Sequence, residues 1–214
     1  MSFAKRNDFL LRRLHSLTGV IPVGVFLINH FIANSFAIQG AEAYNHHVEF
    51  LRSLPYLYAI EIGFIAIPIM FHAFLGVYIS FTGQANVGTQ NYLRNWFYLF
   101  QRITGVILVF FIAWHVYTTR FSGQEDLFAL MQAKLLSPAY IAFYVVGVLA
   151  ATYHFANGMW GFMVTWGITL SPKSQRLSTY ACIGLFLLMS FAGINSMLAF
   201  NGNHISFMNP TGGH

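Results

Sequence analysis

Four histidines lie deep inside long apolar stretches of the sequence: His30, His72, His115 and His154. A polar side chain is costly in such surroundings, so a residue of this kind usually faces a functional interior. Neutral imidazole binds metal ions, relays protons, or donates hydrogen bonds that hold helices together. For one such histidine alone, the hydrogen-bonding role and a functional role are equally expected. Four of them together favour a site that holds a cofactor.

An internal repeat relates the four histidines. The stretch SLTGVIPVGVFLIN precedes His30 and RITGVILVFFIAW precedes His115, so the same Thr-Gly-Val-Ile motif opens both. The segments 53–76 and 137–158 also match, because in each a Ser and a Pro come first, a histidine follows 17 or 16 residues after the proline, and a glycine comes four residues later. The repeat indicates that helices 1 and 2 are echoed by helices 3 and 4, with a fifth helix added.

The composition predicts a membrane protein. Of the 214 residues, 57% are hydrophobic and only 8% are charged, which leaves too little polar surface for a soluble globule. Each uncharged block can hold a span of about 20 residues. We therefore predict one all-α domain over 1–214 with five transmembrane helices, near 14–36, 55–82, 95–120, 138–168 and 177–200.

Lys and Arg predict the orientation of these helices. With a cytoplasmic N-terminus, the inner segments hold eight of these residues and the outer loops hold three, so the C-terminus lies outside. The formal charge of +5 reflects this topology, since no basic patch is interleaved with stacking aromatics and no nucleic-acid role is indicated. The inner residues are Lys5, Arg6, Arg12, Arg13, Arg94, Arg102, Lys173 and Arg176, and the outer ones are Arg52, Arg120 and Lys134.

The helical rise places the histidines at two depths. At 1.5 Å per residue, His72 and His154 lie roughly 25 Å below the outer face of a hydrocarbon core about 30 Å thick, and His30 and His115 lie roughly 20 to 25 Å above the inner face. Two histidines at each level, from two helices each, match two bis-imidazole haems stacked inside a bundle of helices 1 to 4. The sequence therefore predicts two b-type haems, with zinc, copper or a proton relay as alternatives.

Other residues near these levels have simpler expected roles. Gly76 and Gly158, each one turn beyond its histidine, are predicted to leave room for a flat macrocycle, although glycine also serves close helix packing. No motif for soluble catalysis is present, so the chain is interpreted as an electron conduit. The remaining histidines are expected to be solvated at span ends or in loops and to bind no iron: His15, His46, His47, His204 and His214.

Several motifs together resemble a known family. RRLHSLTGVIPVGVFLINHF, GAEAYNHH, RNWFYLFQRITGVI, HFANGMWGF and VTWGITLSPKSQRLSTY are similar to the di-haem cytochrome b subunits of the five-helix, single-anchor type found in succinate:menaquinone oxidoreductases. The resemblance covers roughly residues 8 to 200. It implies four axial ligands, paired as His30 with His115 at the outer haem and His72 with His154 at the inner haem.

The resemblance also implies partners and an electron path. A flavoprotein with covalent FAD and an iron-sulfur protein would bind the cytoplasmic face of a bacterial membrane, and electrons from succinate would cross both haems to menaquinone. The inner segments 1–13, 84–95 and 171–176 are the expected docking elements, although their charge also serves topology.

Two other functions remain open from the sequence. The anchor of a fumarate reductase, or of another quinone-linked dehydrogenase such as a hydrogenase, belongs to the same class. Related fumarate reductases carry a proton-assisting glutamate two residues before the helix-4 ligand, where this chain has Thr152. The other function is a non-redox bundle or transporter with a His-lined proton path, for which Pro22 and Pro68 are the only candidate helix breaks within the spans.

The quinone is expected near the outer haem. A quinone needs a slot open to lipid and a few polar groups for its carbonyls. Asn29 and Trp114 each adjoin an axial ligand, and the outer loop carries Glu42 and Glu49. Glu61 is predicted to be either an intramembrane proton acceptor or a neutral group bonded to a neighbouring helix.

Overall fold

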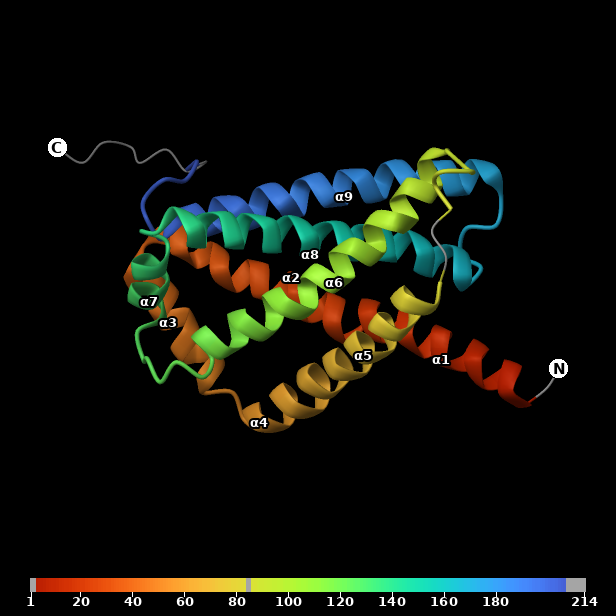
Figure 1. The fold of residues 1–214 in the computed structure, drawn as a ribbon. Helices are drawn as coiled ribbons and strands as arrows, with labels where there is room; N and C mark the ends of the chain where they lie inside the picture. The colour runs from red at the N-terminus through yellow and green to blue at the C-terminus, as the bar shows by residue number, and fades with distance from the viewer. Residues whose placement is uncertain (1–2, 84–85, 207–214) are drawn as a thin grey trace.

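The protein consists of helices that run from one end of the molecule to the other (Figure 1). The computed structural model describes residues 3–83 and 86–206, and all elements in these ranges are helical. Five helices are long and apolar enough to cross a membrane, which confirms the predicted fold class. They cover Asn7–Gln39, Leu57–Thr82, Leu93–Thr119, Pro138–Thr165 and Pro172–Ala199.

Prolines interrupt the regular hydrogen bonding of the first two spans. The first contains α1 (Phe3–Val20) and α2 (Pro22–Ser35), followed by the short 3-10 turn η1 (Phe36–Gln39). Pro22 has no N–H to donate, and the α-helix is interrupted at the residue before it.

The second span contains the short α4 (Leu57–Ala59), the π-helix η2 (Ile60–Ala66) and α5 (Ile67–Thr82). The π-helix ends two residues before Pro68, and its wider turn removes the clash between the proline ring and the carbonyl four residues earlier.

The last three spans are single helices: α6 (Leu93–Thr119), α8 (Pro138–Thr165) and α9 (Pro172–Ala199). The fifth begins five residues before its predicted start at 177, because Ser171 and Ser174 form a capping box and Pro172 occupies the first turn. The fourth ends before its predicted end at 168, since Gly167 adopts a φ of 72° just beyond it.

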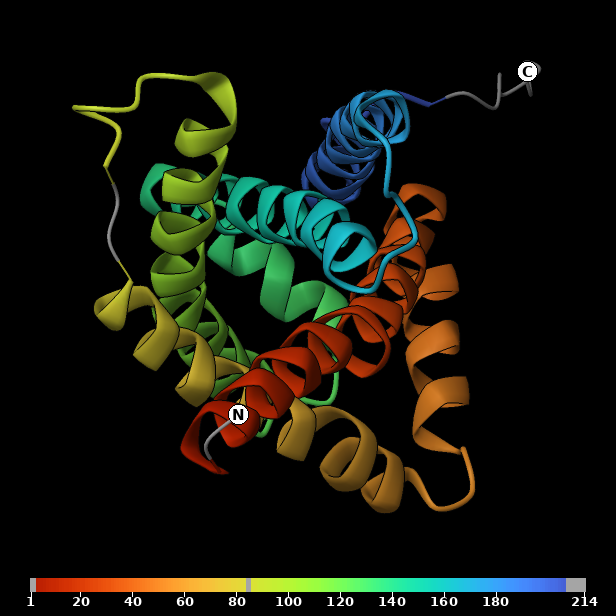
Figure 2. The same cartoon turned by 90° about the vertical axis from the view of Figure 1, so that its right-hand side faces the viewer.

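Four spans form a ring. α1 contacts α5 and α8, and α6 also contacts α5 and α8, so the first and third spans lie diagonally opposite each other, as do the second and fourth. Figure 2 shows this arrangement along the bundle, with α9 outside the ring against α8 and α2. The predicted four-helix bundle of the first four spans, with the fifth helix added, is therefore present.

Two short helices close the end of the bundle that the sequence predicts to be outer. α3 (Ala41–Arg52) and α7 (Leu127–Lys134) stand where the sequence predicted loops, and they pack together with η1 at this end (Figure 1). Asp126 caps α7 and accepts a hydrogen bond from the Asn45 amide of α3 at 3.0 Å. Their buried side chains join the ends of α8 and α9 in one core: Ala37, Tyr44, Phe128, Met131, Leu135, Tyr144, Met197, Ala199 and Phe200.

Candidate functional site

The four buried histidines meet in two pairs inside the ring. The pair that the sequence predicts to be inner, here named the inner pair, is His72 of α5 and His154 of α8, with ring centroids 6.0 Å apart and ring planes at 87°. The outer pair is His30 of α2 and His115 of α6, with centroids 5.8 Å apart and planes at 79°. Each pair joins diagonally opposite helices, so the structure brings together the residues that the sequence paired.

Backbone carbonyls hold both rings of the inner pair. The His72 Nδ1 lies 3.0 Å from the carbonyl oxygen of His15, and the His154 Nδ1 lies 3.1 Å from that of Gln101. A carbonyl can only accept, so Nδ1 carries the proton and the Nε2 lone pair is directed elsewhere. In metal-binding histidines generally, a hydrogen bond from the ring nitrogen that does not bind the metal orients the imidazole.

The repeated Thr-Gly-Val-Ile motif has a structural role at this level. A Cβ on Gly19 would lie 2.5 Å from Cε1 of His72, and a Cβ on Gly105 would lie 3.1 Å from Cε1 of His154. Each glycine therefore lets one helix pass close to the histidine of its neighbour. This contact was not predicted, although the motif carried a usable signal. Gly19 and Gly105 each come four residues after the residue whose carbonyl bonds an imidazole.

The outer pair is held by side chains. The His115 Nδ1 lies 3.2 Å from the hydroxyl of buried Tyr144, and that hydroxyl donates to Sδ of Met131 at 3.6 Å. The hydroxyl thus accepts from Nδ1–H, and Nε2 of His115 again keeps its lone pair. His30 differs, because its Nε2 lies 3.3 Å from the amide nitrogen of Asn34, which also donates to the His30 carbonyl at 2.8 Å.

These pairs fit axial ligation of a planar metal macrocycle. Two imidazoles bound on opposite sides of one metal ion, with metal–nitrogen bonds of about 2 Å, have ring centroids about 6 Å apart. The observed separations of 5.8 and 6.0 Å agree with this value. Within residues 3–83 and 86–206, no group of three or more His, Cys, Asp or Glu side chains forms a site of the kind that holds a bare metal ion.

The other sequence-predicted histidines are mostly less exposed than expected. The prediction for His15 was wrong: its ring stacks on His72 with centroids 4.0 Å apart, because α1 extends further than the predicted first span. His47 is half-buried against Phe36, His204 is also half-buried, and His46 is exposed. His214 lies outside the described residues.

The two glycines predicted to pack against haem face polar side chains. A Cβ on Gly76 would lie 3.0 Å from Nε2 of His15, and a Cβ on Gly158 would lie 3.3 Å from Nε2 of Gln101. His15 and Gln101 occupy the same position in the repeat, so the two glycines have equivalent neighbours. The packing of Gly76 and Gly158 against a macrocycle stays a prediction.

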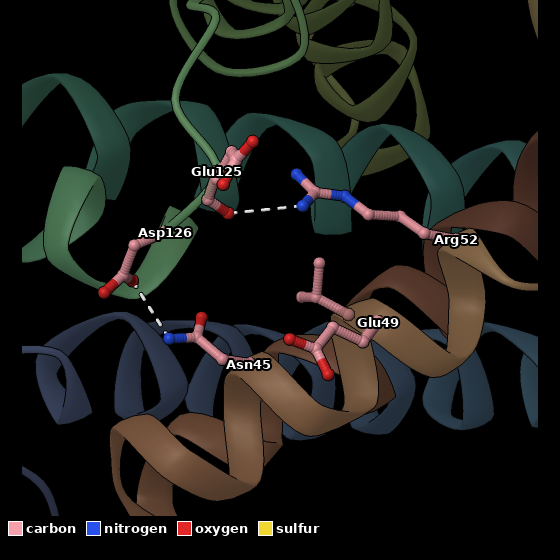
Figure 3. Close-up of a pocket in the computed structure, with 6 residues that line it drawn as sticks. Asn45, Glu49, Arg52, Glu125 and Asp126 are labelled. Carbon is pink, nitrogen blue, oxygen red and sulfur yellow. Dashed lines mark hydrogen bonds between the residues drawn. The ribbon is translucent and has the colours of Figure 1, made fainter.

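The four residues predicted to bind quinone are all exposed, and Trp114 has 47% of its surface accessible. Of these four, only Glu49 lines the pocket of about 310 Å³ between α3 and the start of α7 (Figure 3). Arg52 donates to the Glu125 carbonyl at 3.2 Å across this pocket. Asn29, Glu42 and Trp114 do not line it.

Glu61 forms an ion pair with the third span. Arg120 donates from Nε and Nη2 to its two carboxylate oxygens at 3.1 and 2.9 Å. The hydrogen bonds that Arg120 donates to the Glu61 carboxylate raise the pKa of Arg120. Glu61 is therefore bonded to a neighbouring helix as predicted, but the prediction that it is neutral was wrong, because its carboxylate is one half of an ion pair that joins η2 to the end of α6.

At the end of the bundle that the sequence predicts to be inner, Arg94 is engaged within the bundle. Its guanidinium lies 3.5 Å from the centroid of the Trp160 ring and donates to Asn157 at 3.3 Å and to Thr179 at 2.6 Å. The structure thus gives Arg94 an internal role that the sequence did not predict, whereas Lys173 and Arg176 are exposed.

Fold and site define a multi-pass helical membrane protein whose bundle carries two levels of paired imidazoles. Residues 84–193 match the family model described as succinate dehydrogenase/fumarate reductase transmembrane subunit. The chain is 50% identical over 197 residues to the succinate dehydrogenase cytochrome b558 subunit of Bacillus subtilis, covering 91% of this chain and 98% of that one. It is also 34% identical over 95 residues to the succinate dehydrogenase hydrophobic membrane anchor subunit of Halobacterium salinarum, covering 44% and 70%.

The chain therefore belongs to the family of succinate dehydrogenase/fumarate reductase transmembrane subunits. The family resemblance that the sequence motifs carried is confirmed.

Proposed function

We propose that this chain is the membrane anchor and electron-transfer subunit of a succinate dehydrogenase, and that it holds two b haems. The observation that carries the proposal is the pairing of four imidazoles on diagonal helices, with the Nδ1 atoms of three of them hydrogen-bonded so that Nε2 is left for a metal. Bound there, the haems supply reversible one-electron transfer at two depths in the membrane. The Bacillus relative, named as a cytochrome b558 subunit, supports the same assignment.

The chain's own residues orient the imidazoles and determine which ring nitrogen is left to bind a metal. The His15 and Gln101 carbonyls keep the inner imidazoles in the Nδ1–H tautomer, and Tyr144 does so for His115. Asn34 now shares the Nε2 lone pair of His30, so ligation by His30 requires this amide to rotate away.

Partners dock on the inner side in this proposal. A flavoprotein with FAD and an iron-sulfur subunit bind the cytoplasmic face of a bacterial cytoplasmic membrane, with the chain's N-terminus inside and its C-terminus outside. Lys173 and Arg176 at the start of α9 are exposed cations on that face. The names of both relatives, each a succinate dehydrogenase subunit, support a complex of this kind.

Menaquinone accepts the electrons at the outer level. Trp114 is next to the ligand His115 and offers an exposed indole for stacking on a quinone ring. Protons come from the outer surface, where Glu49, Glu125 and Asp126 line one pocket. A proton route of the kind that the glutamate of related fumarate reductases assists is not expected here, because its place is taken by Thr152, which is fully buried and bonds Ser190 at 2.8 Å between α8 and α9.

A reduced-minus-oxidised difference spectrum of the purified membrane protein tests the haem proposal. We expect a b-type α band, with haem and protein in a 2:1 ratio by extraction. The His72→Ala/His115→Ala double variant, produced to the same level, is the control and should lack the band. A wild-type protein without a b-type band contradicts the proposal and favours a non-redox bundle.

A further inference from the structure

One ligand of the inner pair is stacked on a third histidine. The His15 ring lies parallel to the His72 ring, with centroids 4.0 Å apart and planes at 9°. The same residue accepts the His72 Nδ1–H through its backbone carbonyl at 3.0 Å. His15 thus touches His72 on its edge and on its face.

The other ligand of the inner pair lacks such a ring. Gln101 occupies the place of His15 in the repeat and accepts from His154 Nδ1, but its side chain is used elsewhere. It donates from Nε2 to the His154 carbonyl at 3.0 Å and accepts from Asn157 at 2.8 Å. One imidazole of the pair is therefore stacked, whereas the other is held by hydrogen bonds alone.

The His15 side chain occupies a position that is unfavourable for one of its ring nitrogens. Nε2 of His15 is buried with no hydrogen-bond partner, which is unfavourable for a polar group. A Cβ on Gly76 would lie 3.0 Å from this atom, so the ring is held between the α5 backbone and the His72 ring. The flat His15 ring limits rotation of the His72 ring, because it covers one face of that ring while Gly19 of α1 lies close to its Cε1 edge.

We infer that His15 is a positioning residue that fixes the plane of the His72 imidazole and keeps the inner pair nearly perpendicular. The inference rests on the proposed function, since the planes matter for a haem that the pair would bind. The 87° angle between His72 and His154 is the quantity that the stack controls. In a low-spin ferric haem, the angle between axial imidazole planes sets the splitting of the iron d orbitals, so a perpendicular pair gives a larger maximum g value than a parallel pair. Second contacts of this kind tune a metal site without binding the metal.

Electron paramagnetic resonance of the oxidised membrane complex tests the role of the ring. His15→Gln introduces the side chain that Gln101 has at the equivalent position of the repeat. It removes the stack without leaving a cavity. We expect the maximum g value of the inner haem to fall while the outer signal is unchanged. The inner signal is the one that His154→Ala removes. His15→Phe keeps a flat ring and should retain the wild-type g value.

His47→Ala is the matched control. His47 also stacks in parallel on a ring, that of Phe36, at 4.1 Å and 9°, but touches no member of either pair in this stack. Its replacement should leave both signals unchanged. If His15→Gln loses the inner haem altogether, retention of haem and g value by His15→Phe still supports the inference.

Two results overturn it. An unchanged inner g value in His15→Gln with normal haem content contradicts the positioning role alone, as does an equal shift in His15→Phe. Wild-type membranes without any low-spin haem signal contradict the proposed function, and the inference with it.

Discussion

At the residue scale, the chemistry depends on which nitrogen of each histidine is already engaged. His72, His154 and His115 each use Nδ1 in a hydrogen bond, which fixes the tautomer that a metal needs at Nε2. Two of the three acceptors are backbone carbonyls that no side-chain substitution removes. The site is therefore sensitive to the path of α1 and α6 as well as to the ligands.

Removing one ligand from each pair should separate the two haems. His72→Ala and His154→Ala should abolish the same spectral component, and His30→Ala and His115→Ala the other, because a single imidazole leaves a five-coordinate iron that is bound less firmly. Low-temperature difference spectra of the α band measure this. Loss of one shared component in His30→Ala and His72→Ala would contradict the pairing.

The close approach of α1 to His72 gives a second prediction at this scale. Gly19→Ala places a Cβ 2.5 Å from Cε1 of His72, a distance that forces the ring or the helix to move. We expect loss of most of the inner component while the outer one persists. Gly184→Ala on α9 meets no atom within 4 Å and is the control. Full inner haem content in Gly19→Ala would show that the ring moves without loss of binding.

At the element scale, the long apolar blocks predicted the five spans because a helix must satisfy its own backbone in lipid. The short helices α3 and α7 were not predictable in the same way. α3 (AEAYNHHVEFLR) mixes polar and apolar residues, and its helical form depends on packing Tyr44 against Phe128 and Phe200 from distant parts of the chain. The local sequence pattern thus predicts the spans, whereas the helical form of α3 and α7 depends on tertiary contacts.

The cap of α7 should make the stability of the outer end depend on pH. The Ala129 N–H and the Asn45 amide lower the pKa of Asp126 below its usual 3.8. Because the folded-state pKa is lowered, this stabilisation is complete above 3.8 and is lost as the pH falls through the lowered value. The effect is at most about 1 kcal/mol, since the carboxylate is exposed and screened.

Thermal unfolding of the detergent-solubilised protein at pH 7 and at about pH 3 measures this loss. Asp126→Asn keeps a capping oxygen but cannot titrate. Its melting temperature should therefore fall less between pH 7 and about pH 3 than that of the wild type. Equal decreases in both proteins would assign the acid sensitivity to other carboxylates.

Two groups of inner cations should behave differently. Arg94→Ala loses its bonds to Asn157 and Thr179, and we expect the bundle to lose about 2 kcal/mol of stability. Lys173→Glu and Arg176→Glu should leave stability and haem content intact while releasing succinate-oxidising activity from washed membranes at high salt. Thermal unfolding and sedimentation of the activity measure the two effects.

Arg52→Glu is the opposite-side control for release, because Arg52 lies beside the Glu125 carbonyl at the end of the bundle that the sequence predicts to be outer. It should leave retention unchanged. Full retention in the Lys173 and Arg176 variants would mean that these charges serve topology alone.

At the scale of the whole molecule, the two histidine levels were predictable because helical rise converts residue number into depth. The diagonal arrangement of α5 with α8 and of α2 with α6 turns two depths into two pairs. The stack of His15 on His72 was not predictable, since it depends on how far α1 continues beyond the apolar block and on the crossing of α1 with α5. Distances along one helix follow from sequence, whereas contacts between helices follow from packing.

The two levels make the direction of electron flow relative to the membrane testable. If electrons enter at the inner pair and leave at the outer pair, each crosses most of the membrane and meets a proton drawn from outside. A potential that is negative inside then assists turnover by up to about 2.3 kcal/mol per charge per 100 mV. Inverted sealed vesicles expose the cytoplasmic face to succinate, and their lumen can be energised to be positive. We expect an uncoupler to slow succinate oxidation by menaquinone, but not by a water-soluble dye that takes electrons from the soluble subunits. Equal menaquinone rates with and without uncoupler would place the quinone site beside His72 and His154, because only a path that ends at the outer pair moves charge across the bundle.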